Sequence, residues 1–189
     1  MGLRDLLFGT PDPTQSWIAN PTVSLELDLD RHMLGGVRLG EPVERISGLG
    51  PPDNLKATRD GCCEYKALGL QVGFDGGRID SFQLVFAEAE YLSGYTPFAG
   101  PIRHHGQALA LDSNTTLDDF MARFGEPYWR DDDDDETILF YEFAADFEWQ
   151  VEVDEDSRLK ALLLVTPPLM SGAEQRQVYG VNKPWPPSR

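Results

Sequence analysis

The segment that decides the fold runs from Thr116 to Val165 and reads TLDDFMARFGEPYWRDDDDDETILFYEFAADFEWQVEVDEDSRLKALLLV. Its first part predicts a short amphipathic helix, because apolar residues recur at i, i+3, i+4 and i+7: Leu117, Phe120, Met121 and Phe124. Thr116 can cap the first turn through its hydroxyl, and Asp119 stands at the capping-box position. Gly125 is suited to end the helix.

The rest of this segment predicts an antiparallel meander of three strands. Residues 138–143 are rich in aromatic side chains, and residues 149–154 alternate between apolar and polar, which is the period of a half-buried strand. Residues 159–165 are almost all apolar, so we expect them in the centre of the sheet. Helix and strands are expected to share one core, made of Leu117, Phe120, Phe124, Trp149, Val151, Leu163 and Val165.

A weaker copy of the same pattern lies upstream, with GEPVERISGLGPP at 40–52 and EYKALGLQVGFDGGRIDSFQLVF at 64–86. Any helix followed by a meander gives some chance matches, but here the matches keep their order and the gaps fall in loops and turns, which favours a repeat. The matched pairs are Gly50/Gly125, Pro52/Pro127, Tyr65/Tyr141, Gln71/Gln150, Val72/Val151, Asp75/Asp154, Arg78/Arg158, Leu84/Leu164 and Val85/Val165. We therefore expect an α+β fold of two tandem helix–meander units, with the helices packed on one face of an antiparallel sheet.

The remaining segments complete a five-part division of the chain. We expect an N-terminal arm at 1–20, a first unit at 21–90, a connecting loop at 91–107, a second unit at 108–168 and a Pro-rich tail at 169–189. The first unit should open with a half-buried strand at 23–29, where apolar and polar residues alternate. We expect the tail to pack on the domain through Tyr179 and Trp185.

Residues 37–87 and 109–166, with their two Gly-x-Pro stops, resemble the BamE/SmpA and beta-lactamase-inhibitor-protein superfamily. The resemblance implies a helical stretch followed by an antiparallel sheet, present twice in the inhibitors, and a habit of binding proteins. BamE lipoproteins have a signal peptide and a lipid-anchored cysteine, and the secreted inhibitors use disulfides. From its sequence, we expect this chain to have no signal peptide, no lipid-anchored cysteine and no comparable set of disulfides. No individual binding residue is carried over.

The chain is strongly acidic, with 16 Lys and Arg against 32 Asp and Glu and a net charge of −16. Nucleic acids and anionic membranes both need a basic surface, so neither is expected as a partner. The charge suits a basic protein partner, or solubility alone. Two adjacent cysteines, Cys62 and Cys63, cannot form an unstrained disulfide, and no signal peptide or apolar span is evident, so we expect a cytoplasmic protein.

The sequence contains no pattern typical of a catalytic or cofactor site. His104 and His105 could supply a base or metal ligands, but His32 is far away in sequence and no zinc-site spacing is present, so an exposed loop pair is favoured. Cys62 and Cys63 lack an obvious neighbouring base and are expected as inert strand cysteines. We therefore expect no catalytic residue, no metal and no cofactor.

The acidic run of residues 131–136 is the least ordinary feature of the sequence. It lacks the glycine and final glutamate of a calcium loop, so a solvated hairpin or loop, or a negative patch for a basic partner, is expected instead. Tyr128 and Trp129 precede it and could anchor an interface, or pack in the core under the helix end. The expected protein-binding set is Tyr128, Trp129, Asp131, Asp132, Asp133, Asp134, Asp135 and Glu136.

Two classes of function remain open. The first is a non-catalytic, acidic protein-binding module, in its narrowest form an immunity or inhibitor protein that neutralises a basic toxin domain. The alternative is a small-molecule-binding protein or an enzyme, with a pocket near residues 88–106. A well-formed pocket lined by convergent polar groups favours the alternative, and an exposed sheet surface with aromatic and carboxylate side chains favours the binding module.

Overall fold

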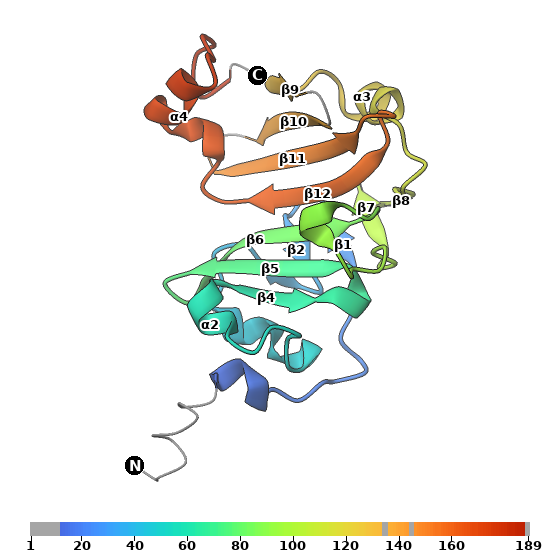
Figure 1. The fold of residues 1–189 in the computed structure, drawn as a ribbon, viewed down its shortest axis with the longest axis vertical. Coiled ribbons are helices and arrows are strands. Elements are labelled where there is room, and N and C mark those ends of the chain that lie inside the picture. The colour runs from blue at the N-terminus through green and yellow to red at the C-terminus, as the bar shows by residue number, and fades with distance from the viewer. Residues whose placement is uncertain (1–11, 134–135, 144–145, 188–189) are drawn as a thin grey trace.

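The protein is mainly β, as seen in a computed structural model that describes residues 12–133, 136–143 and 146–187. Within these residues, twelve strands form a seven-stranded and a five-stranded sheet (Figure 1). The expected α+β class, with helices covering one face of a sheet, is therefore wrong. The helices are too short for that role: α2 (Ala57–Asp60), α3 (Leu117–Phe124), α4 (Ala173–Val178) and the 3-10 turns η1 (Pro13–Ser16), η2 (Val43–Leu49), η3 (Lys66–Leu68), η4 (Glu90–Leu92) and η5 (Leu169–Ser171).

The seven-stranded sheet is antiparallel throughout and has the order β4-β5-β6-β12-β11-β10-β9. Two meanders meet in its middle, where β6 pairs with β12, and Figure 1 shows the green meander below the orange one. Its strands are β4 (Cys62–Tyr65), β5 (Leu70–Asp75), β6 (Arg78–Val85), β9 (Trp129–Asp132), β10 (Glu136–Phe143), β11 (Phe147–Asp154) and β12 (Leu159–Val165).

The two meanders have equivalent registers. Leu84 of β6 is equivalent to Leu164 of β12, and Phe82 is equivalent to Leu162. Leu84 lies opposite Leu162 just as Leu164 lies opposite Phe82, so β6 and β12 pair symmetrically about Gln83 and Leu163. A register shift occurs at Gly73/Phe74 in β5 and again at Glu152/Val153 in β11. A tyrosine hydroxyl in each meander donates to a glycine carbonyl that follows the preceding helical segment: Tyr65 to Gly50 at 3.2 Å and Tyr141 to Gly125 at 2.8 Å.

The preceding helical segments differ between the two meanders. α3 begins with the expected capping box, in which Thr116 and Asp119 each bond the backbone of the other. The upstream segment forms the 3-10 helix η2 instead, with buried side chains at Val43 and Ile46. A spacing of three matches the 3-10 period, and the β-branched residues and Gly48 do not favour an α-helix. The first helix–meander unit therefore lacks the expected α-helix.

The five-stranded sheet, in the order β3-β2-β1-β7-β8, was not expected. Its strands are only two or three residues long: β1 (Leu27–Asp28), β2 (Met33–Leu34), β3 (Val37–Arg38), β7 (Ile102–His104) and β8 (Gln107–Leu109). β1 and β7 pair in parallel, with Leu27 opposite Ile102. Of the expected strand at 23–29, only Leu27 and Asp28 lie in a strand. The segment 91–107 supplies β7 and the first residue of β8 in addition to making a connection.

One main core lies between the two sheets and beneath η2 and α3. From the expected set, Leu117, Phe120, Trp149 and Val151 are buried in it, and Phe124 packs against it. Leu163 and Val165 are only half-buried, because β12 turns Leu162 and Leu164 toward the core instead. A uniformly apolar strand carries no alternation, and a slip of one residue exchanges its two faces.

The other face of the second meander is covered by the C-terminal segment, at the end of the molecule where α4 lies in Figure 1. Met170 and Val181 are buried there against Phe140. The Tyr179 ring lies 6.0 Å from Phe140, and Trp185 lies 5.7 Å from Tyr128. The packing expected of these two rings is confirmed, and the segment also contains the helix α4.

Candidate functional site

The acidic run forms part of a β-hairpin at one edge of the seven-stranded sheet. β9 pairs with β10, with Asp132 opposite Thr137 and Trp129 opposite Phe140. The amide of Asp133 donates to the carbonyl of Glu136 at 2.9 Å, which continues the pairing beyond β9. The run is therefore held by backbone hydrogen bonds at both ends, and Asp134 and Asp135 lie outside the described residues.

One side of the β9 backbone faces away from the sheet. In an antiparallel pair, residues bonded to the neighbouring strand alternate with residues that point away from it. Asp133 bonds to Glu136 of the neighbouring strand, so by this alternation Asp131 also faces β10. The amides and carbonyls of Arg130 and Asp132 therefore point to the outer side. Within the described part of the chain, no strand pairs with this side. Such an edge can accept a further strand from another molecule.

The opposite edge of the same sheet, at β4, is closed by the chain itself. Asn54 donates through Nδ2 to the carbonyl of Cys62 at 2.9 Å and accepts from the amide of Glu64 at 3.0 Å. The amide of Asp53 donates to the Glu64 carbonyl at 2.8 Å, and its Oδ2 accepts from the amide of Lys66 at 2.7 Å. The outer groups of β4 are thus satisfied, and β9 is the accessible edge.

Local cations neutralise part of the acidic run. Asp132 Oδ1 lies 2.7 Å from Arg130 Nε and accepts from Thr137 Oγ1 at 2.7 Å, and these contacts, the threonine bond first, lower the pKa of Asp132. Glu136 Oε2 lies 2.7 Å from Nζ of Lys160, which is almost fully buried. Among the described residues, Asp131 makes no ion pair. The edge still carries negative charge, but less than the count of carboxylates indicates.

Tyr128 and Trp129 pack beneath the C-terminal segment. The Tyr128 hydroxyl donates to the carbonyl of Lys183 at 3.2 Å, and Lys183 Nζ donates back to the Tyr128 carbonyl at 2.6 Å. Trp129 is half-buried against the cluster around Phe140. The expected alternative of core packing therefore describes both rings, although their cover is the chain terminus and not the end of α3. They border the acidic edge without being free anchors for it.

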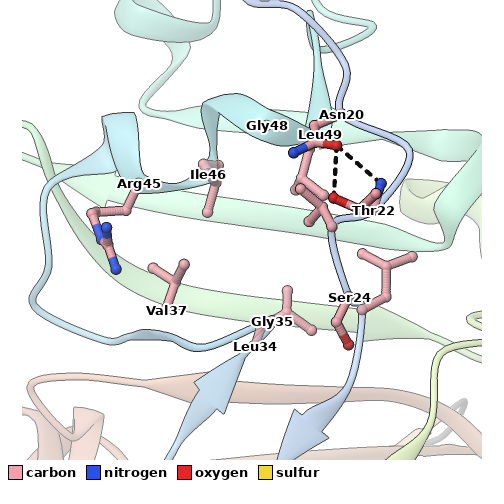
Figure 2. A pocket seen from close by; sticks show the side chains of 12 residues that line it. Asn20, Thr22, Ser24, Leu34, Gly35, Val37, Arg45, Ile46, Gly48 and Leu49 are labelled. Carbon is pink, nitrogen blue, oxygen red and sulfur yellow. Dashed lines mark hydrogen bonds between the residues drawn. The ribbon is translucent and has the colours of Figure 1, made fainter.

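Two surface pockets bear on the small-molecule alternative. Figure 2 shows one of about 360 Å³, with Leu34, Val37 and Ile46 among its apolar lining. Its polar groups already have partners: Asn20 Oδ1 accepts from the amide and the hydroxyl of Thr22 at 3.0 and 2.8 Å. The pocket therefore has a mixed apolar and polar lining, in which Asn20 and Thr22 already satisfy each other.

The second pocket, of about 290 Å³, lies at the expected place beside the 88–106 segment. Its lining contains no titratable side chain: Val23, Leu25, Ala67, Leu68, Pro97, Ala99, Gly100 and Pro101. Neither pocket holds the pairing of a nucleophile with a base, or of an acid with a base, that hydrolytic chemistry requires.

The structure brings the three histidines to neighbouring positions. The buried His32 ring stacks on Phe147 at 4.4 Å and lies 6.2 Å from Trp149. His104 lies 6.3 Å from the same tryptophan, and its pKa is lowered by burial and then by the adjacent His105. His104 and His105 both contact Asp30, which sequence reasoning missed. No local pattern links Asp30 to residues more than seventy positions away.

The buried cysteine, Cys63, is not suited to chemistry that needs a thiolate. Cys63 is buried, and burial raises the pKa of its thiol to about 12, so it stays protonated at neutral pH.

Comparison with protein-family models, curated proteins and solved structures found no match to this chain. The superfamily resemblance of the sequence therefore stays a prediction. In the described part of the chain, no helix is both long and apolar enough to cross a membrane.

Proposed function

We propose that the protein is a non-catalytic module that binds a basic protein partner through the β9–β10 edge. The observation that carries the proposal is the open, acidic edge strand β9 in a chain of net charge −16, whose opposite sheet edge is closed. Charged side chains on an edge strand discourage pairing between like molecules. A basic extended segment would meet the same edge without repulsion, and could use the outward amides and carbonyls of Arg130 and Asp132.

The narrowest form of this proposal is an immunity or inhibitor protein that neutralises a basic toxin domain. The strong negative charge supports it, because electrostatic attraction accelerates association between oppositely charged proteins.

A charge-matched pair of variants tests the site. The first is Asp131→Asn with Asp133→Asn, which removes one charge from β9 and one directly after it, and keeps Asp132 and Glu136 with their ion-pair partners. The second is Glu155→Gln with Asp156→Asn, which removes two exposed charges from the β11–β12 turn. We expect the first variant to slow association with a partner recovered by pull-down, and to reduce its dependence on salt, more than the second does.

The measurement is surface-based or stopped-flow kinetics at two ionic strengths. Equal association rates for the two variants would place the binding surface elsewhere. An acidic partner would contradict the electrostatic argument altogether. The substitution Arg130→Pro blocks an outward amide and should abolish binding if the partner adds a strand to β9, provided that the variant keeps its circular-dichroism spectrum.

The pocket in Figure 2 supports a second candidate, the binding of a small molecule. Its volume of about 360 Å³ lies at the lower end of the range for ligand pockets. A thermal-shift screen against small organic compounds tests this candidate, with Val37→Phe as the variant that fills the pocket. A shift in the original protein that Val37→Phe removes would favour ligand binding over the protein-binding role.

A further inference from the structure

We propose that Asp30, His104 and His105 form a binding site for a divalent transition metal of the zinc type. One ligand atom from each residue lies within 4.8 Å of the ligand atoms of the other two. Two imidazole nitrogens and one carboxylate oxygen are a donor set that zinc accepts. The site is separate from the acidic edge, since it belongs to the five-stranded sheet.

The topology explains why the three residues meet. Asp30 follows β1, and His104 ends β7, and these two strands run in parallel. The pairing continues past β1, where the amide of Leu29 donates to the carbonyl of Arg103 at 3.0 Å. The carboxyl ends of parallel neighbours lie at the same edge of a sheet, so Asp30 reaches the β7–β8 turn. There its Oδ2 accepts a hydrogen bond from the backbone amide of His105.

The distances are close to those that coordination requires. Asp30 Oδ1 lies 2.9 Å from His105 Nδ1 and 3.7 Å from His104 Nε2. Ligand atoms about 2.0–2.1 Å from a tetrahedral zinc ion stand about 3.3 Å from one another. The carboxylate thus already has suitable separations from both rings. The two imidazole rings have centroids 3.8 Å apart and planes inclined by 31°, so at least one ring must rotate before both nitrogens point at a shared ion.

Packing holds two of the ligands in place and leaves one side open. The His104 ring lies edge-on to Phe124 at 5.0 Å and to Trp149 at 6.3 Å. Asp30 is fixed by its bond to the His105 amide, while the His105 side chain is 79% exposed. Three protein ligands therefore occupy one side of the ion, and a fourth position faces solvent, where water or a side chain of another protein can bind.

The same contacts also occur in a plain ion pair between Asp30 and a protonated histidine, so the test must detect coordination itself. The probe is Co²⁺, whose visible absorption is intense when it is bound in tetrahedral geometry, and Zn²⁺ is then added to displace it. Four full-length proteins are compared: the original sequence, Asp30→Asn, His105→Asn and Asp28→Asn. The last removes a nearby carboxylate that is not a proposed ligand, and so controls for local charge.

We expect the original protein to bind one Co²⁺ ion, which Zn²⁺ displaces. Asp30→Asn and His105→Asn should each weaken binding by more than about 100-fold, since even the loss of a second-shell partner costs about 10- to 100-fold. Asp28→Asn should weaken it by less than about threefold. His105→Asn is the safer variant for folding, because His105 has a φ of 52° and asparagine tolerates this left-handed region.

Thermal unfolding with and without Zn²⁺ gives a second readout, because an ion that binds only the folded state raises Tm. The rise should be present in the original protein and in Asp28→Asn, and absent in the two ligand variants. Either of two results would overturn the proposal: no tetrahedral Co²⁺ spectrum in the original protein, or equal binding in Asp30→Asn. Equal binding would assign the ion to the general acidic surface.

Discussion

The two meanders of the seven-stranded sheet share their backbone pattern and differ in what surrounds it. In both, the first amide of the helical segment donates to a carbonyl in the turn of the meander's second hairpin. These bonds run from Val43 to Gly77 at 2.9 Å and from Leu117 to Ser157 at 2.8 Å. The first meander ends at a closed edge strand, β4. The second adds β9, which stays open. The core pattern is thus repeated, and the features available for binding lie where the second meander departs from it.

A further difference lies on the outer face. Glu142 and Glu148 are cross-strand partners in the second meander, at positions that Lys66 and Gly69 occupy in the first. Glu148 is fully buried and accepts from Gln150 at 2.6 Å and from the amide of Met170 at 3.2 Å. The C-terminal segment therefore covers a carboxylate pair that has no counterpart in the other half.

The largest expected effect concerns the helical segments. Phe120 and Ile46 stand at equivalent positions, and both are buried. We expect Phe120→Ala to lower the free energy of unfolding by about 3–5 kcal/mol, and Ile46→Val by about 0.5–1.5 kcal/mol, from the volume that each leaves empty. Denaturant unfolding measures both, with exposed Arg123→Ala as the control within α3. A cost for Phe120→Ala no larger than that of the control would show that α3 does not cover the core.

The second prediction concerns Glu142 and Glu148, the carboxylate pair that only the second meander has. Burial, and then the neighbouring Glu148 carboxylate, raises the pKa of Glu142 far above its ordinary value of 4.5. The folded state then holds a proton that the unfolded chain releases, so this residue lowers stability as the pH rises above about 4.5. Glu142→Gln keeps a neutral side chain at every pH. We expect its stability relative to the original protein to increase from pH 5 to pH 8.

Urea unfolding at several pH values measures this difference, and exposed Glu155→Gln serves as the control. The difference between the original protein and the control should stay nearly constant over the same range. A constant difference for Glu142→Gln as well would mean that Glu142 is ionised in the folded protein and hydrated beneath the C-terminal segment.

Local signals in the sequence predicted local structure well. The capping box of Thr116 and Asp119 and the end of α3 at Gly125 are present, because each depends on residues within one or two helical turns. The alternation in β11 correctly placed Trp149 and Val151 in the core. The phase of β12 was wrong at Leu163 and Val165, because an unbroken apolar run does not show which face turns inward.

Non-local pairing could not be predicted in the same way. The strands of the five-stranded sheet are only two or three residues long, too short to show a period, and β1 meets β7 only through the tertiary fold. The layer that covers the core is therefore a sheet where helices were expected. Asp30 is near His104 and His105 for the same reason. The acidic run was visible in the sequence, but its neutralisation by Arg130 and Lys160 was not.

The smallest expected effect concerns the hydrogen bonds from Tyr65 to Gly50 and from Tyr141 to Gly125, one in each meander. Tyr65→Phe and Tyr141→Phe each remove one hydroxyl and leave a glycine carbonyl without its donor. By length, the Tyr141 bond is the stronger one, at 2.8 Å against 3.2 Å for the Tyr65 bond. By burial, the Tyr65 bond is the harder one to replace, because Gly50 is buried and Gly125 is exposed. Water can replace the lost donor only at Gly125.

Because an unsatisfied buried acceptor costs more than a lost bond that water replaces, burial should outweigh bond length. We expect Tyr65→Phe to lower the free energy of unfolding by about 1–3 kcal/mol and Tyr141→Phe by about 0.5–1.5 kcal/mol. Denaturant midpoints, with exposed Tyr91→Phe as the control, measure the three values. If Tyr141→Phe proves the more damaging change, bond geometry decides the strength of these contacts, and the two halves of the sheet are held by the same interaction to different degrees.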